Sequence, residues 1–385
     1  MAVAQAGGAE IRVACSPGER RVVLLRDDRI EAFAIERPDL PDGLGDVHAA
    51  RVSAVSTAMS GAFLTMAGGE TGFLPENETP SPRRPIAQVV SEGDLVLVRT
   101  TRAPQGGKGP RLSMRVANPP PHAGDIALLA RGEGPVLRMA RLWPEAPVIV
   151  DLGTVAAALR PVLGSRVTLA RGRALEAEEE EALEELGASV VELGQGARLS
   201  IHPTPALVAI DVDAGTAAGG ADPLAHHRLN ERAVREVARQ IRLRSLAGAI
   251  LLDLAGLSTR KREALLAPLQ AALAEDPLTP QLLGVTKGGL IEMIRRRVET
   301  PLHEVLGRPP SAATLLLAAL RRAARDVAAN PGRALALRAA PEVLAVAATL
   351  PRALAEYRDL AGRALALRPD AGLRPGQESI EEDGA

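Results

Sequence analysis

A strand–helix–strand pattern in the second half of the chain restricts the fold more than any other feature. The runs ALVAIDVD at 206–213 and GAILLD at 248–253 are short and apolar, as expected of buried strands. Asp222-Pro223 is a favourable N-cap and first-turn pair, and a helical pattern fills the interval that follows it. A strand, a helix of about twenty residues and another strand predict a crossover unit with parallel strands.

Acidic residues stand at the ends of both predicted strands. Asp211 and Asp213 are two residues apart, so their side chains share a face, and Asp253 closes the second strand. Ligands of open α/β sheets gather at the carboxyl ends of strands, where Asp253 can lie beside Asp211. Close carboxylates repel each other unless they share a proton or a cation, and Mg²⁺ prefers one or two carboxylates. The same spacing also fits acids that cap turns or pair with arginine.

The intervening helix carries five arginines at spacings of 4, 3, 4 and 3 residues, beside an apolar stripe of Val234, Val237 and Ile241. Arginines next to a carboxylate cluster suit a phosphate backbone that approaches a metal. A solvated helix face with surface ion pairs explains the pattern as well. The five residues are Arg228, Arg232, Arg235, Arg239 and Arg242.

The segment TKGGLIEM supplies Lys287 and two glycines before a stretch that we expect to be helical. A lysine before a helix N-terminus predicts an anion cradle, although a simple loop fits equally well.

The first third of the chain has the pattern of β-structure. Residues 10–37 read as short strands with an Asp-Asp hairpin turn, and residues 44–117 hold five short apolar runs broken by glycine. Five such strands predict a small barrel, and the proline-rich NPPPHAG at 118–124 marks a boundary. Further on, we expect an acidic helix that ends at Gly187, helices at 263–275, 311–329 and 341–357, a late strand at RALALRPD, and a frayed tail.

Phe63 and Phe73 are two of only five aromatic residues, and both fall in the predicted barrel. Barrels of the OB type stack bases on aromatic side chains, and Lys108 and Arg111 in a glycine-rich loop suit phosphate. The alternative is that both phenylalanines fill the barrel core.

Composition narrows the class of protein. The 385 residues are 46% apolar and 24% charged, which is typical of a globular chain with two or three domains. The net charge of −1 points to no polyanion partner by itself, although a local patch can bind one. Cys15 is the only cysteine, which excludes a CxxC zinc site and fits a reducing cytoplasm. The N-terminus lacks signal-peptide features, and no apolar run approaches about 18 residues, so we expect no membrane span.

Several of these stretches, in this order, resemble the ribonuclease E/G family. In the first third of the chain they are GERRVVLLRDDRIEAFAIERP, ARVSAVSTAMSGAFLTMAGGETGFLP and GGKGPRLSMRV. In the second half they are IHPTPALVAIDVDAG, NERAVREVARQIRLRSLAGAILLDLAGL and GGLIEMIRRR. ARQIRLRSLAGAILLD is the most specific match, and the similarity is collinear over most of the chain.

The fold class that the resemblance implies is a mixed α+β and α/β multidomain chain. It joins an RNase H-like subdomain, an inserted OB-type β-barrel and a deoxyribonuclease-I-like α/β catalytic subdomain. We expect the N-terminal strands of the RNase H-like subdomain at 1–37, the RNA-binding barrel at 38–118 and the remainder of the RNase H-like or reduced sensor region at 119–200. The catalytic subdomain is expected at 201–308, and a C-terminal helical part and tail at 309–385.

The activity that the resemblance implies is Mg²⁺-dependent cleavage of single-stranded RNA, with 3′-hydroxyl and 5′-phosphate ends, in processing or decay of ribosomal, transfer or messenger RNA. Asp211 and Asp253 match the family's metal-binding aspartates, and Asp213 stands where the family usually has a catalytic-site asparagine. The positions that match the barrel's RNA-contacting residues are Phe63, Phe73 and Lys108.

The chain departs from the family pattern at several points. The CxxC zinc link expected after EMIRRR is absent, so we expect no structural zinc, and any homo-oligomer would form without it. The Arg-Thr-Ala-Gly signature of the 5′-monophosphate sensor is missing from 119–200. The usual DVNSGRAT reads DVDAGTAA, DFIDM reads DLAGL and SRFGLLEM reads TKGGLIEM, so the shell around the acids is altered. A non-catalytic RNA-binding relative is the main alternative to the nuclease, followed by a metal-dependent phosphoesterase for small substrates.

Overall fold

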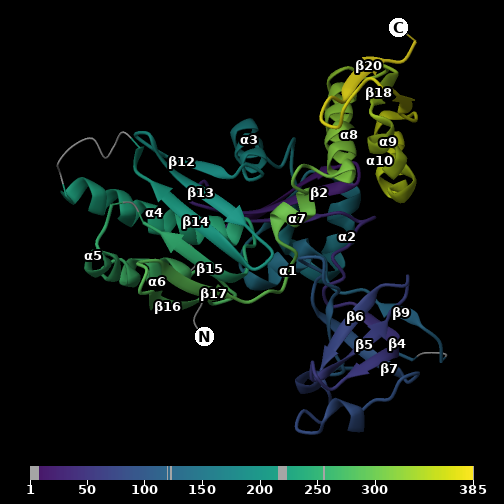
Figure 1. Ribbon diagram of the computed structural model, residues 1–385. Helices are drawn as coiled ribbons and strands as arrows, with labels where there is room; N and C mark the ends of the chain where they lie inside the picture. The colour runs from purple at the N-terminus through teal and green to yellow at the C-terminus, as the bar shows by residue number, and fades with distance from the viewer. Residues whose placement is uncertain (1–7, 119, 122–123, 216–222, 255, 385) are drawn as a thin grey trace. The chain divides into compact units, whose positions relative to one another are not determined.

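The computed structural model describes residues 8–118, 120–121, 124–215, 223–254 and 256–384. The chain is a mixed α+β protein whose internal contacts divide it into two compact units. Unit 1 comprises 1–41, 135–188 and 302–385, and unit 2 comprises 42–134 and 189–301. Figure 1 shows the elements of both. Within the described residues, no helix is long and apolar enough to cross a membrane.

Unit 1 is built on a five-stranded sheet in the order β11-β10-β1-β2-β3. Its strands are β1 (Glu10–Ser16), β2 (Glu19–Arg26), β3 (Arg29–Glu36), β10 (Val148–Val150) and β11 (Val167–Leu169). The predicted hairpin is confirmed: β2 and β3 are antiparallel, and both residues of their turn, Asp27 and Asp28, have positive φ angles of 50° and 58°. Two-residue hairpin turns need this backbone twist, which aspartate tolerates.

Helices α1 (Pro135–Leu142) and α2 (Gly153–Leu163) share one buried core with this sheet. The predicted acidic helix is α3 (Ala177–Glu185), which follows the 3₁₀ turn η3 (Gly164–Arg166) and β11. It begins with a capping box between Glu176 and Glu179, which satisfies backbone donors of its first turn.

The end of unit 1 corrects two sequence predictions. After α7 (Leu302–Leu306) and α8 (Ala312–Ala329), the predicted helix at 341–357 divides into α9 (Pro341–Ala345), η5 (Val346–Thr349) and α10 (Pro351–Ala361). The tail expected to be frayed contains β20 (Ser379–Glu382), which is antiparallel to β18 (Leu335–Ala339). The late strand β19 (Ala366–Pro369) is confirmed and is parallel to β18. The tail is ordered because its backbone groups pair with a distant strand.

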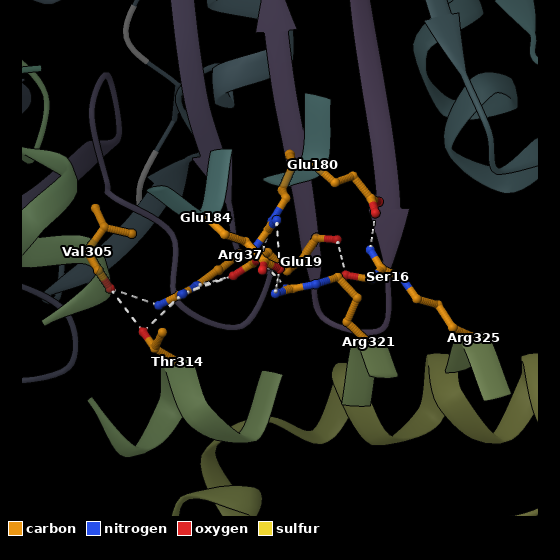
Figure 2. Close-up of polar contacts among 10 residues, drawn as sticks. Ser16, Glu19, Arg37, Glu180, Glu184, Val305, Thr314, Arg321 and Arg325 are labelled. Carbon is orange, nitrogen blue, oxygen red and sulfur yellow. Dashed lines mark hydrogen bonds and ion pairs between the residues drawn. The ribbon is translucent and has the colours of Figure 1, made fainter. Parts of the chain in front are cut away.

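A buried carboxylate organises the polar interior of unit 1. The side chain of Glu19, at the start of β2, is part of a residue that is only 2% exposed. Nε of Arg37 donates to its Oε2 at 3.0 Å, and Nη1 of Arg321, from α8, donates to its Oε1 at 3.0 Å. Arg37 also donates to the carbonyl of Val305 and the hydroxyl of Thr314 (Figure 2). One glutamate thereby joins β2, the end of β3 and α8.

Unit 2 contains a closed five-stranded barrel, which is consistent with the OB type. Its strands are β4 (Val47–Ser56), β5 (Gly61–Thr65), β6 (Thr71–Pro75), β7 (Leu95–Arg102) and β8 (Arg111–Ser113), with 3₁₀ turns η1 (Glu76–Glu78) and η2 (Ile86–Gln88). The order β5-β6-β8-β7-β4 closes because β5 also pairs with β4. All five predicted strands are confirmed, and a sixth that was not predicted, β9 (Ala127–Ala130), pairs with the outer edge of β4.

The second part of unit 2 is a six-stranded sheet in the order β12-β13-β14-β15-β17-β16. Its strands are β12 (Val190–Gly194), β13 (Ala197–Pro203), β14 (Leu207–Asp213), β15 (Gly248–Asp253), β16 (Gln281–Val285) and β17 (Ile291–Arg295). The predicted crossover is confirmed, because β14 and β15 are parallel and α4 (Pro223–Leu243) connects them. The short α5 (Thr259–Glu263) and then α6 (Leu266–Leu273) follow.

The prediction of a helix after Gly289 is wrong. Residues 291–295 form β17, which lies between β15 and β16 and is antiparallel to both. Ile291 and Met293 alternate into the core cluster that also contains Val234 and Val237 of α4. Pairing on both sides and this alternation explain why the segment is a strand.

Candidate active site

The structure brings two of the predicted acids side by side. Asp211, in β14, and Asp253, the last residue of β15, are Cα partners in the parallel register. Neighbouring strands lie about 4.8 Å apart, and residues in register on parallel strands project to the same face. Ile210 and Val212 project to the other face, where they are buried. The two carboxylates therefore share one face of the sheet, and α4 packs against the opposite face, where Ile210 and Val212 lie in its core cluster.

The electrostatics of Asp211 reflect this proximity. Partial burial, then the charge of Asp253 and then that of Asp213, raise the pKa of the Asp211 carboxyl above its usual value. His202 and Arg198 oppose the rise in pKa in part. A carboxyl with a raised pKa beside other carboxylates marks a site that a bound cation would stabilise.

Asp253 is held by an arginine that sequence reasoning did not single out. Nη1 of Arg262, in α5, donates to Oδ1 of Asp253 at 2.6 Å and to the Gly289 carbonyl at 2.7 Å. The same guanidinium donates to the carbonyls of Leu254 and Leu257, both at 2.9 Å. Arg262 thus joins the segment after β15 to the turn between β16 and β17 around Asp253, whose side chain remains 48% exposed. Arg262 follows Asp253 by nine positions, and this spacing by itself does not predict a contact between them.

Asp213 is engaged differently. Its Oδ2 accepts hydrogen bonds from Nε and Nη2 of Arg198 at 3.1 and 2.8 Å, and its Oδ1 accepts from the backbone N–H of Gly215 at 2.9 Å. The Gly215 hydrogen bond, and then Arg198, lower the pKa of the Asp213 carboxyl. The contacts of Asp213 are therefore those of the alternative reading, in which the acid caps a turn and pairs with an arginine. The β13–β14 register sets Arg198 opposite Asp213, a contact that the sequence analysis did not predict because it included no strand at 197–203.

The donor set fits a hard divalent ion held by two carboxylates. No group of three or more His, Cys, Asp or Glu in the described part of the chain is arranged to hold a metal. Mg²⁺ does not need such a group, because it is bound through one or two carboxylates with water and substrate phosphate completing its shell. The raised pKa of Asp211 beside Asp253 fits this kind of site.

The arginine stripe of α4 does not lie beside the acids. The helix buries Ala233, Val234 and Ile241 in the core cluster that also contains Ile210 and Val212, so its polar side faces away from the sheet. Arg228, Arg232 and Arg235 are exposed on that side. Arg239 binds Glu236 at 2.8 Å, and Arg242 donates to the carbonyl of Ala272 at 3.3 Å.

Lys287 lies in the turn between β16 and β17 and not before a helix. The turn is closed by the Thr286 N–H, which donates to the Leu290 carbonyl at 2.8 Å. Gly289, in the same turn, accepts from Arg262. Exposed Lys287 is therefore at the edge of the sheet where β15 ends at Asp253.

The barrel sets its two phenylalanines against each other on its outer surface. Phe63 of β5 and Phe73 of β6 are cross-strand partners, with ring centroids 5.3 Å apart and planes tilted by 57°. Both are half-buried, whereas their neighbours Ala62, Leu64 and Leu74 fill the barrel core. Arg111 of β8 is the partner of Phe73 on the other side. Lys108 is exposed in the β7–β8 loop.

Comparison with known proteins gives one consistent family. A family model described as "Ribonuclease E/G family" matches residues 146–298. Ribonuclease E of Synechocystis sp. is 34% identical over 121 residues, which cover 31% of this chain and 18% of that protein. Ribonuclease E of Nostoc sp. is 35% identical over 121 residues, which cover 30% of this chain and 17% of that protein. The chain thus spans less than a fifth of the length of these two relatives.

A more extended similarity is with ribonuclease G of Escherichia coli (strain K12), which is 23% identical over 409 residues. This alignment covers 77% of this chain and 82% of that protein. It therefore includes much more of the chain than the segment that the family model matches.

Proposed function

Because the chain belongs to the ribonuclease E/G family, we propose that it is an endoribonuclease that cleaves single-stranded RNA with Mg²⁺. The observation that carries the proposal is the pairing of Asp211 with Asp253 at the open face of the sheet. We assign the RNase H-like role to unit 1, the RNA-binding role to the barrel and the deoxyribonuclease-I-like catalytic role to the sheet of β12–β17. Cys15, the only cysteine, cannot form a CxxC zinc link, so any homo-oligomer forms without it.

In this proposal Asp211 and Asp253 would hold the Mg²⁺ ion. When bound, such an ion supplies Lewis-acid polarisation of a phosphoryl oxygen and a lowered pKa for bound water. Arg262 holds the Asp253 carboxylate in place through the 2.6 Å hydrogen bond, while three carbonyls hold its guanidinium in position. Asp213, held by Arg198, orients the attacking water.

The reaction is hydrolysis of a phosphodiester. A water oxygen bonds to phosphorus, the P–O3′ bond breaks, and a proton reaches O3′, which leaves 3′-hydroxyl and 5′-phosphate ends. Phe63 and Phe73 would stack bases of the strand, each stack being worth about 1–3 kcal/mol, with Lys108 and Arg111 beside the backbone. Lys287, exposed in the turn between β16 and β17, would contact a neighbouring phosphate. The arginines of α4 would contribute only a long-range positive potential, because they face away from the acids.

A cleavage assay tests the proposal. Purified protein is incubated with a 5′-labelled, unstructured RNA with and without Mg²⁺, beside Asp253→Asn and the control Glu263→Gln, whose exposed side chain is in the same short helix as Arg262. We expect Mg²⁺-dependent internal cuts by the wild type and the control, and none by Asp253→Asn. Cuts by Asp253→Asn at the wild-type rate would refute the assignment.

The alternative is a relative that binds single-stranded RNA without cleaving it. Arg262 favours it, because the charge of Asp253 already has a partner before any metal binds. RNA binding without cuts in Mg²⁺ or Mn²⁺ would support this alternative. A phosphoesterase for small substrates predicts instead that Phe63→Ala and Phe73→Ala leave activity unchanged.

A further inference from the structure

The aromatic pair of the barrel continues into a row of basic side chains. Arg111 of β8 is the Cα partner of Phe73 on one side and of Arg102, the last residue of β7, on the other. The outer surface of the barrel therefore presents, across four neighbouring strands, Phe63, Phe73, Arg111 and Arg102 in consecutive positions. Neighbours of this kind lie about 5 Å apart, close enough to contact the same ligand.

A third arginine reaches this row from the chain that leaves β17. The N–H of Ala103 donates to the carbonyl of Val298 at 2.8 Å, and the hydroxyl of Thr300 donates to the carbonyl of Pro104 at 3.0 Å. These bonds align residues 103–104 with residues 298–300 inside unit 2. Arg102 directly precedes Ala103, and Arg297 directly precedes Val298. The hydrogen bond between Ala103 and Val298 therefore brings the two arginines together.

The guanidinium of Arg297 is fixed from the other side by Gly248, the first residue of β15. A Cβ atom built on Gly248 would lie 2.4 Å from Nη2 of Arg297 and 2.8 Å from its Nε. The guanidinium therefore packs directly on this glycine, which has a positive φ of 87°. Any larger residue would displace it.

We call Arg102, Arg111 and Arg297 the arginine cluster; within the described ranges, no acid is among the charges that shift the pKa of Arg102. Burial, and then the charges of Arg111 and Arg297, lower the pKa of Arg102. Among the described residues, its buried Nε has no hydrogen-bond partner. In the part of the chain that the structure describes, Arg111 donates to the neutral Oδ1 of Asn77, at 3.3 Å. By contrast, buried Arg295, two residues before Arg297, is paired with Asp276 at 2.7 Å.

Three guanidinium groups without a carboxylate repel one another, and an anion that they share removes this cost. We propose that Arg102, Arg111 and Arg297 together bind one backbone phosphate of single-stranded RNA, directly beside the nucleotides that stack on Phe63 and Phe73. Guanidinium groups suit this ligand because their N–H groups match phosphate oxygens in pairs. The inference rests on the proposed function in so far as it takes RNA as the ligand.

The location of the arginine cluster also determines the path of the bound RNA. Arg297 packs on Gly248 at the start of β15, and Asp253 is at the end of that strand. Five residues of extended chain span about 17 Å, so the bound phosphate and the acids lie at opposite ends of β15. RNA that reaches both must run along the sheet, and an oligonucleotide too short to do so loses the contact with the cluster.

Binding without metal tests the cluster separately from catalysis. The affinity for a fluorescein-labelled 20-nucleotide oligouridylate is measured by anisotropy in EDTA at several KCl concentrations. The variants are Arg297→Gln and Arg102→Gln, and the matched control is Arg296→Gln, which removes an exposed arginine beside the cluster. We expect each cluster variant to bind about tenfold more weakly at moderate salt. The slope of log K against log [KCl] should fall by about 0.7, the value for one phosphate contact on a single strand.

Further variants separate a phosphate contact from structural damage. Arg297→Lys keeps the charge, so it should keep the wild-type slope, whereas Arg102→Gln/Arg297→Gln should lower the slope no further than either single change. A slope for Arg297→Gln equal to that of Arg296→Gln would overturn the proposal, whether or not the protein cleaves RNA. A lowered slope in a protein that makes no Mg²⁺-dependent cuts would support the phosphate site and refute the nuclease.

Discussion

The side-by-side acids predict that Asp211→Asn, which the proposed mechanism expects to abolish cleavage, makes the protein more stable. In the absence of metal, partial burial and then the charges of Asp253 and Asp213 raise the pKa of the Asp211 carboxyl, so these charges oppose its ionisation. We expect Asp211→Asn to remove this repulsion and to raise the free energy of unfolding of the β12–β17 sheet. Asparagine keeps the size of the side chain, so packing changes little.

The strand spacing sets the magnitude. Two unit charges about 5 Å apart repel by about 3 kcal/mol at an effective dielectric constant of about 20, and by about 0.8 kcal/mol at that of water. Because Asp211 is exposed, water screens the interaction and the lower value applies. We therefore expect a gain of about 1 kcal/mol at pH 7 in low salt, and much less in 1 M KCl.

The pH dependence has a definite sign. The pKa of Asp211 is raised in the folded state, so as the pH falls the folded protein takes up this proton before the unfolded chain does. The penalty is largest above the folded-state pKa and disappears below the unfolded-state pKa, near 4. The difference between Asp211→Asn and the wild type should therefore vanish as the pH falls below about 4.

The assay must report on unit 2 alone. Trp143 and Tyr357, the only residues of their kinds, are both in unit 1, so intrinsic fluorescence reports mainly on that unit. Hydrogen exchange of the backbone amides of β14 and β15 measures the local stability directly. Addition of Mg²⁺ at a hundred times its dissociation constant should stabilise the wild type by about 2.7 kcal/mol and Asp211→Asn by far less.

Two results would refute this reasoning. The first is an Asp211→Asn protein that is less stable than the wild type at pH 7 in low salt without metal. The second is a gain that 1 M KCl leaves unchanged, because such a gain would not be electrostatic. Glu263→Gln, which removes an exposed acid in the next helix, serves as the control and should shift neither stability nor its salt dependence.

Three more predictions concern other parts of the chain. Arg262→Gln should reduce the single-turnover rate of cleavage, and Arg262→Lys, which keeps a donor for Asp253, should reduce it less. This difference tests whether Arg262 positions Asp253. Phe73→Ala should weaken binding of the RNA in EDTA by about 1–3 kcal/mol in anisotropy titrations, and an unchanged affinity would exclude stacking on this ring. Glu19→Gln should destabilise unit 1 by about 3–5 kcal/mol in urea unfolding followed by tryptophan fluorescence, because it leaves Arg37 and Arg321 without a buried counter-charge. The pKa of Glu19 is lowered in the folded state, so this loss should be present at neutral pH and disappear as the pH falls through that pKa.

Features that depend on neighbouring residues were predictable from the sequence. The strands at 207–213 and 248–253, the helix between them, the Asp27-Asp28 turn and the five barrel strands follow from hydrophobic period and turn chemistry. The position of Asp211 and Asp253 at strand ends also follows, because a parallel crossover brings equivalent ends together. These properties are set within a few residues of each position, or by a general rule of chain connection.

The remaining features depend on partners that are distant in sequence. Residues 291–295 form a strand because β15 and β16 pair with it on both sides, and the tail is ordered because β18 pairs with it. The contact of Arg262 with Asp253 depends on how α5 packs, and the direction of the α4 arginines depends on which face of the sheet the helix covers. The sequence by itself thus determined which acids stand at the strand ends, because local pattern sets where a strand stops. Only the tertiary structure decided which cations meet those acids, because that depends on register and on the packing of segments that no local pattern relates.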